Sequence, residues 1–425
     1  MKVGAAVVDI TPPLGLEMAG FGARASGASG VHDPLEARVL VAEGSDGTTV
    51  ALVVADLLQI DSRLQDLIAA DVLATTGIPR DRLQLAGTHT HSGPDFAEPS
   101  GVERETGRRI AEATTRAWID RREATAAVGI GHVEGIAANR RPNGGPVDNR
   151  VTVTRFDDVS GEPIATLFNY GCHATTLGPN NTLYSADFPG PACRLVEAAV
   201  GGVAIFTTGP QGDVNPGGYS PEDSMVGIVV PSRTFASAER HGRDLAAVAI
   251  DVQRRLRPVR VDRAWGTSKV IELRRKPLPP LAVARSAAAT ARQTADTLRQ
   301  ASLTPDATYH ATIAAAYADL IAAQAADPDR DRAVRLRISA LALGPLLHLG
   351  VQGELFVGLG QRIRASLGDD TTCIAALCDG TVGYLPTADA FEIGGYEPNA
   401  SVLVAGEGER LADMLVALAS AAPPS

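Results

Sequence analysis

Short apolar runs recur along the chain, and each ends in a polar or glycine-containing turn. The strand-like runs read GAAVVDI, ARVLVAE, TVALVVADLLQI, LQLAGTHTH, TVTRF, PIATLFNYGCHA and GVAIFTTG. Helical patterns lie between several of them, at 103–119 and 233–255. This alternation predicts an α/β fold in which helices flank a sheet that is parallel at least in part. A short connection with glycines at 44–47 predicts an antiparallel hairpin, so we expect a mixed sheet.

Residues 277–335 depart from this pattern. They are rich in alanine and poor in aromatic residues, and both halves of the segment favour helix. Strand-like sequence resumes directly afterwards with LRISALALGPLLHLG. We therefore expect a helical hairpin inserted at about 277–335 into a single domain that spans residues 1–420.

Charge and hydropathy exclude two classes of partner. The 425 residues carry a net charge of −10, which gives no general attraction to nucleic acid or to anionic membranes. No run of about 20 apolar residues is present, so we expect no membrane span. The start MKVGAAVVDITPPLG turns polar too early for a signal peptide. We expect a cytoplasmic protein whose four cysteines are buried thiols.

Polar side chains follow the ends of the apolar runs. In chain order these exits carry His89 with His91, His173, Asp213 with Asn215, Glu354, and Tyr384. Ligands of α/β sheets bind outside the carboxyl ends of strands, where such side chains can converge. Alternation along an extended chain would place His89 and His91 on one face. Two ordinary polar residues at a strand end would give the same pattern, so the spacing alone does not decide whether the histidines bind a metal.

Two histidines and a glutamate from separate strand ends are typical of catalytic zinc, which keeps one coordination position open. Each residue also has an ordinary structural explanation. Glu354 could lie near a helix N-terminus, where a carboxylate is favourable. Tyr384 could be an ordinary half-buried tyrosine, and Asp213 could bond the backbone of a glycine turn. His348, within LLHLG, is interpreted as a core histidine.

Several motifs occur in one order: GTHTHSGP, NYGCHATTLGPNNTLYSADFPG, TTGPQGDVNP, VQGELF and GYLPTADAFEIGGYE. Together they resemble the neutral/alkaline (non-lysosomal) ceramidase family over roughly residues 2–415. The resemblance implies a catalytic domain with one Zn²⁺ per chain, and its ligands would be His89, His173, Glu354 and Tyr384. His91 would lie beside these ligands or transfer a proton close to the substrate carbonyl. Asp187 would orient His173 or His89, or else stabilise a turn.

The chain departs from this family in three respects. Where the family reads Gly-Asp-Val-Ser-Pro-Asn with a catalytic serine, this sequence has Asn215. We also expect no carboxyl-terminal β-sandwich of the kind found in secreted ceramidases, and no export signal. These departures predict a substrate other than ceramide. Asn215 would be a turn residue or would donate to the acyl oxygen.

The sequence thus predicts a zinc-dependent amidohydrolase that cleaves an N-acyl bond by attack of metal-bound water. His91, Asn215 and Tyr384 are the predicted catalytic side chains, and a small N-acyl or ester compound is the predicted substrate. A metal-dependent esterase or lactonase, or a non-catalytic metal-binding or sensing protein, remains the alternative. Arg140 and Arg141 would form a solvated loop pair or bind an anionic group of the substrate.

Overall fold

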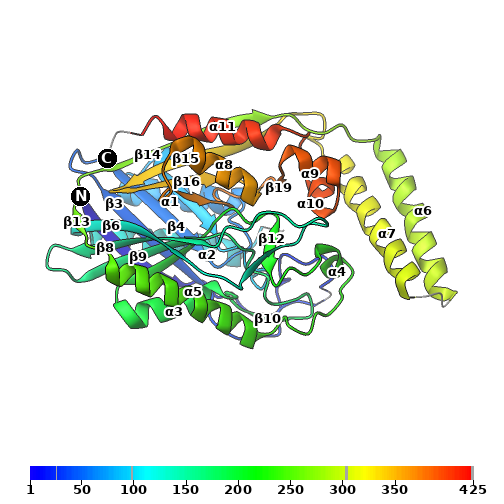
Figure 1. The fold of residues 1–425 in the computed structure, drawn as a ribbon, viewed down its shortest axis with the longest axis horizontal. Helices are drawn as coiled ribbons and strands as arrows, with labels where there is room; N and C mark the ends of the chain where they lie inside the picture. The colour runs from blue at the N-terminus through cyan, green and yellow to red at the C-terminus, as the bar shows by residue number, and fades with distance from the viewer. Residues whose placement is uncertain (25, 97–98, 302–304, 423–425) are drawn as a thin grey trace.

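Two β-sheets pack face to face between layers of helices in the computed structural model (Figure 1). The structure describes residues 1–24, 26–96, 99–301 and 305–422. The predicted α/β class, with a mixed sheet flanked by helices, is confirmed. The second sheet was not expected from the sequence.

The larger sheet has the strand order β11-β9-β8-β6-β1-β3-β4-β5, and β13 pairs with β6. Its strands are β1 (Lys2–Asp9), β3 (Glu36–Glu43), β4 (Thr49–Ala55), β5 (Leu83–Gly87), β6 (Arg122–His132), β8 (Arg150–Asp158), β9 (Pro163–Tyr170), β11 (Val203–Thr208) and β13 (Val259–Arg260). The β4–β5 and β9–β11 pairs are parallel, whereas β3 and β4 form the predicted antiparallel hairpin. Gly47 makes the tight turn of that hairpin with a positive φ of 82°.

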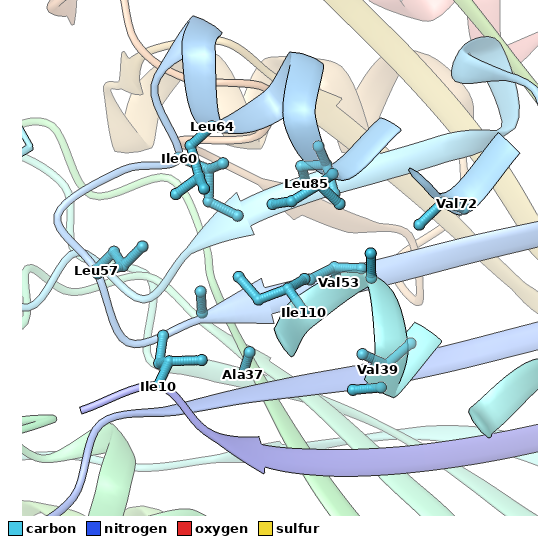
Figure 2. Packing of buried hydrophobic residues seen from close by; sticks show 14 of the residues in the cluster. Ile10, Ala37, Val39, Val53, Leu57, Ile60, Leu64, Val72, Leu85 and Ile110 are labelled. Carbon is cyan, nitrogen blue, oxygen red and sulfur yellow. The ribbon is translucent and has the colours of Figure 1, made fainter. Parts of the chain in front are cut away.

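The two faces of this sheet bury different sets of side chains because successive residues of a strand point to opposite faces. Val39 and Val53 pack under the helices α1 (Ser62–Thr76) and α2 (Gly101–Ile119), where they meet Ile110 (Figure 2). Leu40 and Leu52 point the other way, into a cluster shared with the second sheet. The central strands are therefore buried on both sides.

The second sheet has the order β14-β15-β16-β18, and α8 and α11 cover its outer face. The elements are β14 (Ala264–Leu273), β15 (Val334–Leu343), β16 (Leu346–Val351), β18 (Cys373–Ala375), α8 (Val357–Leu367) and α11 (Glu407–Ala419). At the opposite end of the larger sheet, α3 (Pro189–Val200) and α5 (Phe235–Arg255) cover β8, β9 and β11. Strand ends of both sheets lie in the same region, and the site is formed there by the loops and short strands that follow them.

The predicted helical hairpin is present as α6 (Leu281–Gln300) and α7 (Pro305–Ala326), which pack together and project from the body (Figure 1). The four cysteines are buried and unbridged, as expected. Among the described residues, no helix combines the length and the apolar character that a bilayer crossing requires.

Candidate metal centre and active site

His89 lies just beyond β5, in a conformation that the sequence did not indicate. Its φ is +66°, in the left-handed region that few non-glycine residues occupy. The strand has already ended at Gly87, so an extended backbone is not what brings His89 and His91 together, although their rings do lie side by side as expected, 4.8 Å apart between centroids. The turn buries the His89 ring and places its Nδ1 3.0 Å from the carbonyl oxygen of Leu58. The Nδ1–H therefore donates to this carbonyl, which leaves a lone pair on Nε2.

His173, beyond the end of β9, has the same arrangement. Its Nδ1 lies 2.8 Å from the carbonyl oxygen of Gln211 and 2.9 Å from that of Val214. The ring is fully buried, and its centroid is 4.8 Å from that of His89. Burial and the charge of Arg140 lower the pKa of His173 to about 4. At neutral pH the ring is therefore uncharged and offers a lone pair from Nε2.

Glu354 completes this set from the second sheet, where β17 (Glu354–Leu355) follows β16. Its Oε2 is 2.9 Å from Nε2 of His173 and 3.5 Å from Nε2 of His89. Burial opposes ionisation of this carboxyl, but the contacts with the two imidazoles hold its pKa well below the usual range. Two imidazole nitrogens and a carboxylate oxygen thus meet at one buried position. This donor set fits a divalent cation, and nitrogen ligands anchored through their other ring nitrogen are typical of zinc sites.

His91 lies beside these residues, but its ring is held differently. Its Nε2 is 3.4 Å from Nε2 of His89, and the nitrogen atoms of His89, His91 and His173 lie within 4.8 Å of one another. The buried Nδ1 of His91 has no hydrogen-bond partner in the described part of the chain. The ring instead contacts Phe21 at 4.7 Å between centroids. The three histidines form one buried candidate metal site, in which only His89 and His173 are anchored by backbone carbonyls.

Tyr384 enters the site beside Glu354, because β19 (Tyr384–Leu385) pairs with β17 in parallel and sets the two residues opposite each other. The phenol is buried, and Arg140 donates to its oxygen at 3.2 Å. Burial and the Glu354 carboxylate raise the pKa of Tyr384 well above its usual value, although Arg140 opposes this. A phenolate at this position therefore requires a further positive charge nearby.

Arg140 and Arg141 do not form a solvated loop pair, and this alternative is wrong. Both side chains are 5% exposed, and both donate to Glu397, at 2.8 Å from Arg140 and 2.7 Å from Arg141. Glu397 is the last residue of the GYLPTADAFEIGGYE motif, but the motif gave no indication of this role. Arg140 lines the pocket of the site. Arg141 instead donates hydrogen bonds to the backbone carbonyls of Ala390 and Gly394.

Three polar residues of the family motifs make hydrogen bonds to the backbone. Asn215, in β12 (Val214–Pro216), is fully buried and donates from Nδ2 to the carbonyl of Tyr219 at 2.9 Å, while its Oδ1 has no partner among the described residues. The Asp187 carboxylate accepts hydrogen bonds from the backbone N–H groups of Leu177 and Phe188, and these contacts favour the turn-stabilising alternative. Asp213 accepts from the N–H of Val357, which is also a structural contact.

A small pocket of about 80 Å³ opens beside the histidine cluster. Its walls come from seven parts of the chain and are lined by Gly20, Phe21, Gly22, His91, Arg140, Thr175, Tyr219, Pro221, Ser224, Met225, Tyr384 and Tyr396. Asn215 is not among these residues. The sequence analysis also missed Phe21 and Tyr219, and the glycine-rich stretch AGFGARASG was the available signal for the former.

The chain was compared with known proteins. No protein-family model matches it. Neutral ceramidase A of Dictyostelium discoideum is 26% identical over 260 residues, which are 52% of this chain and 36% of that protein. Neutral ceramidase of Drosophila melanogaster is 25% identical over 267 residues, 53% of this chain and 37% of that protein. The matched segments thus span little more than a third of these relatives.

The fold is also shared. A solved structure described as ceramidase complexed with C2 superimposes with a TM-score of 0.75 and 17% identity, covering 99% of this chain and 75% of that chain. Neutral ceramidase from Pseudomonas aeruginosa gives a TM-score of 0.74 with 20% identity, covering 100% and 75%. Neutral ceramidases are homologues of this chain, by sequence over about half its length and by fold over nearly all of it.

Proposed function

We propose that this homologue of the neutral ceramidases is a zinc-dependent hydrolase that cleaves an amide bond in a small N-acyl substrate other than ceramide. One observation carries the proposal: His89 and His173, whose Nδ1 atoms lie against backbone carbonyls, both direct Nε2 at the carboxylate of Glu354. These three residues would hold the ion, with Tyr384 as the fourth ligand. A bound Zn²⁺ polarises a carbonyl group and lowers the pKa of water toward 7.

The other residues of the pocket suit the charge changes of acyl transfer. Arg140 is a buried cation that already donates to the Tyr384 oxygen, so it stabilises negative charge on the phenolate or on an adjacent substrate oxygen. His91 lines the pocket with a half-buried, neutral imidazole, because desolvation and the neighbouring histidines lower its pKa well below 6.5. We assign His91 the hydrogen bond to the reacting carbonyl or to the leaving amine.

The space directly beside the histidines is small. A volume of about 80 Å³ is well below the ~300–1,000 Å³ of common small-molecule sites, so only the reacting group of a substrate fits there. Asn215 in place of the family serine supports a substrate other than ceramide.

The test compares an amide and an ester that share one acyl group, acetyl 4-nitroanilide and 4-nitrophenyl acetate, with ceramide as a third substrate. We expect the zinc-loaded protein to hydrolyse the amide and to leave ceramide intact. His173→Ala should lose both zinc and activity, whereas His132→Ala, at an exposed position in β6, should keep both. Hydrolysis of the ester alone would indicate an esterase or lactonase. Stoichiometric zinc without turnover would indicate a binding protein, and a wild-type chain that binds no zinc would overturn the proposal.

A further inference from the structure

A larger cavity adjoins the pocket beside the histidines. It has a volume of about 390 Å³ and lies between α7 and the segment of α4 (Pro221–Met225). Arg140, Pro221 and Tyr396 line both cavities. These residues come from three separate parts of the chain, and the two cavities therefore share part of their wall. We call the larger cavity the α7 groove.

The walls of the α7 groove are largely apolar. Pro142, Tyr309, Ile313 and Tyr396 supply rings and an aliphatic side chain. At the inner end, Arg140 pairs with Glu397, and this buried ion pair presents little net charge to the cavity. The volume lies within the range of small-molecule sites. These properties suit an alkyl or aryl group better than a charged one.

The groove is held open by hydrogen bonds between the helical hairpin and the body. The hydroxyl of Tyr309 donates to Asp223 at 2.9 Å, and that of Tyr317 donates to Glu222 at 2.5 Å, so α7 is fixed to α4. Gln324 donates to the carbonyl of Ala400 at 2.9 Å, which fixes the other end of α7 to α10 (Tyr396–Ala400). The hairpin thus forms a preformed wall, and little ordering entropy is lost when a ligand enters.

A third cavity is less suited to this purpose. It is lined by Glu17, Arg24 and Asp95, and it shares with the small pocket only the loop of residues 20–22. Its surface is mainly polar, whereas that of the α7 groove is mainly apolar.

We propose that the α7 groove binds the apolar end of the substrate, an alkyl or aryl group on either the acyl or the amine side, and that Ile313 and Tyr309 set the length that fits. The proposal rests on the hydrolase function and names its substrate class. α7 is then a determinant of specificity rather than a passive insertion.

Ile313→Trp tests the proposal by filling the groove. Two substrate series are used: acyl 4-nitroanilides from acetyl to octanoyl, and N-acetyl amines from methylamine to octylamine. In one series, kcat/KM for the longest member should fall about 10-fold or more, while the shortest member is unaffected. Val283→Trp adds the same ring at a 57% exposed position on α6 and should change neither series. Ile313→Ala, which enlarges the groove, should shift the preference toward longer chains. An equal loss across all lengths, or no change in either variant, would overturn the proposal.

A binding measurement separates this proposal from the hydrolase function. In isothermal titration calorimetry, octanamide should bind the wild type more tightly than it binds I313W, whereas acetamide should show no difference between the two proteins. If the wild type hydrolyses no acetyl substrate, the hydrolase function fails while this readout still tests the groove. If acetyl substrates turn over but chain length has no effect on I313W, the groove proposal fails alone.

Discussion

His89 and His173 each place Nδ1 against a backbone carbonyl, and this contact decides which ring nitrogen is free for a ligand. The strand-exit pattern predicted that these histidines and Glu354 would converge, and they do. It could not predict the left-handed backbone of His89 or the carbonyls of Leu58 and Val214. Those depend on segments that only the tertiary fold brings together.

The anchoring difference gives a prediction for His91. His91→Ala should retain zinc but lower kcat about 10²–10³-fold, because the ring acts on the reacting group and is not held as a ligand. His89→Ala should lose the metal, since its Nδ1 contact with Leu58 marks it as a ligand. Elemental analysis and steady-state kinetics on both variants check this. Zinc loss in His91→Ala with zinc retained in His89→Ala would reverse the two roles.

Asn215 supplies a prediction about the course of the reaction. An amide side chain is a poor nucleophile, and here its nitrogen is bonded to the carbonyl of Tyr219, so we expect hydrolysis without an acyl-enzyme. Single-turnover kinetics should show no burst of leaving group, and intact-mass spectra after quenching should show no added acyl group. Asn215→Ser, which restores the family residue, should keep this behaviour because Asn215 does not line the pocket. An acyl adduct on the wild-type chain would contradict the assignment.

The elements of the fold were predictable where the apolar pattern was strong. The runs at β3, β4, β5, β9 and β11 became strands, and the helical patterns became α2 and α5. β6 and β14 were missed, because alanine, glycine and polar residues fill much of their length and their pairing with β8 and β15 stabilises them. The loop around Phe21 was missed for a similar reason, since its function depends on lying against His91.

That loop gives a prediction at the scale of an element. Gly20 has a φ of +98°, and a Cβ atom there would lie 2.4 Å from Nδ1 of His91. Gly20→Ala must therefore move the loop or the imidazole, and a displacement of ~1 Å can lower the rate on the order of 10²-fold. Gly22→Ala is the matched control, because it also lines the pocket but a Cβ there meets no atom within 4 Å. Kinetics and zinc content of both variants check this, and equal activities would show that the loop does not position His91.

Across the whole molecule, the proposed ligands come from both sheets. His89 and His173 follow strands of the larger sheet, whereas Glu354 and Tyr384 follow strands of the second sheet. The sequence predicted the convergence of these residues but not the second sheet. No single apolar run shows that β14, β15, β16 and β18 pair in one sheet. A metal ion at this position would link the two sheets as well as serve the reaction.

The stability of the molecule should therefore depend on the metal. A ligand that binds only the folded state stabilises it by about 2.7 kcal/mol at 100 times its Kd, so removing zinc with a chelator should lower the Tm by several degrees. Added zinc should restore the Tm of the wild type and of His132→Ala. His173→Ala should have a low Tm that neither chelator nor zinc changes, because half of the anchored imidazole pair is gone. Differential scanning calorimetry with parallel metal analysis makes the comparison. If the wild type loses its zinc and keeps its Tm, the ion does not hold the two sheets together, and its ligands must be sought on one sheet alone.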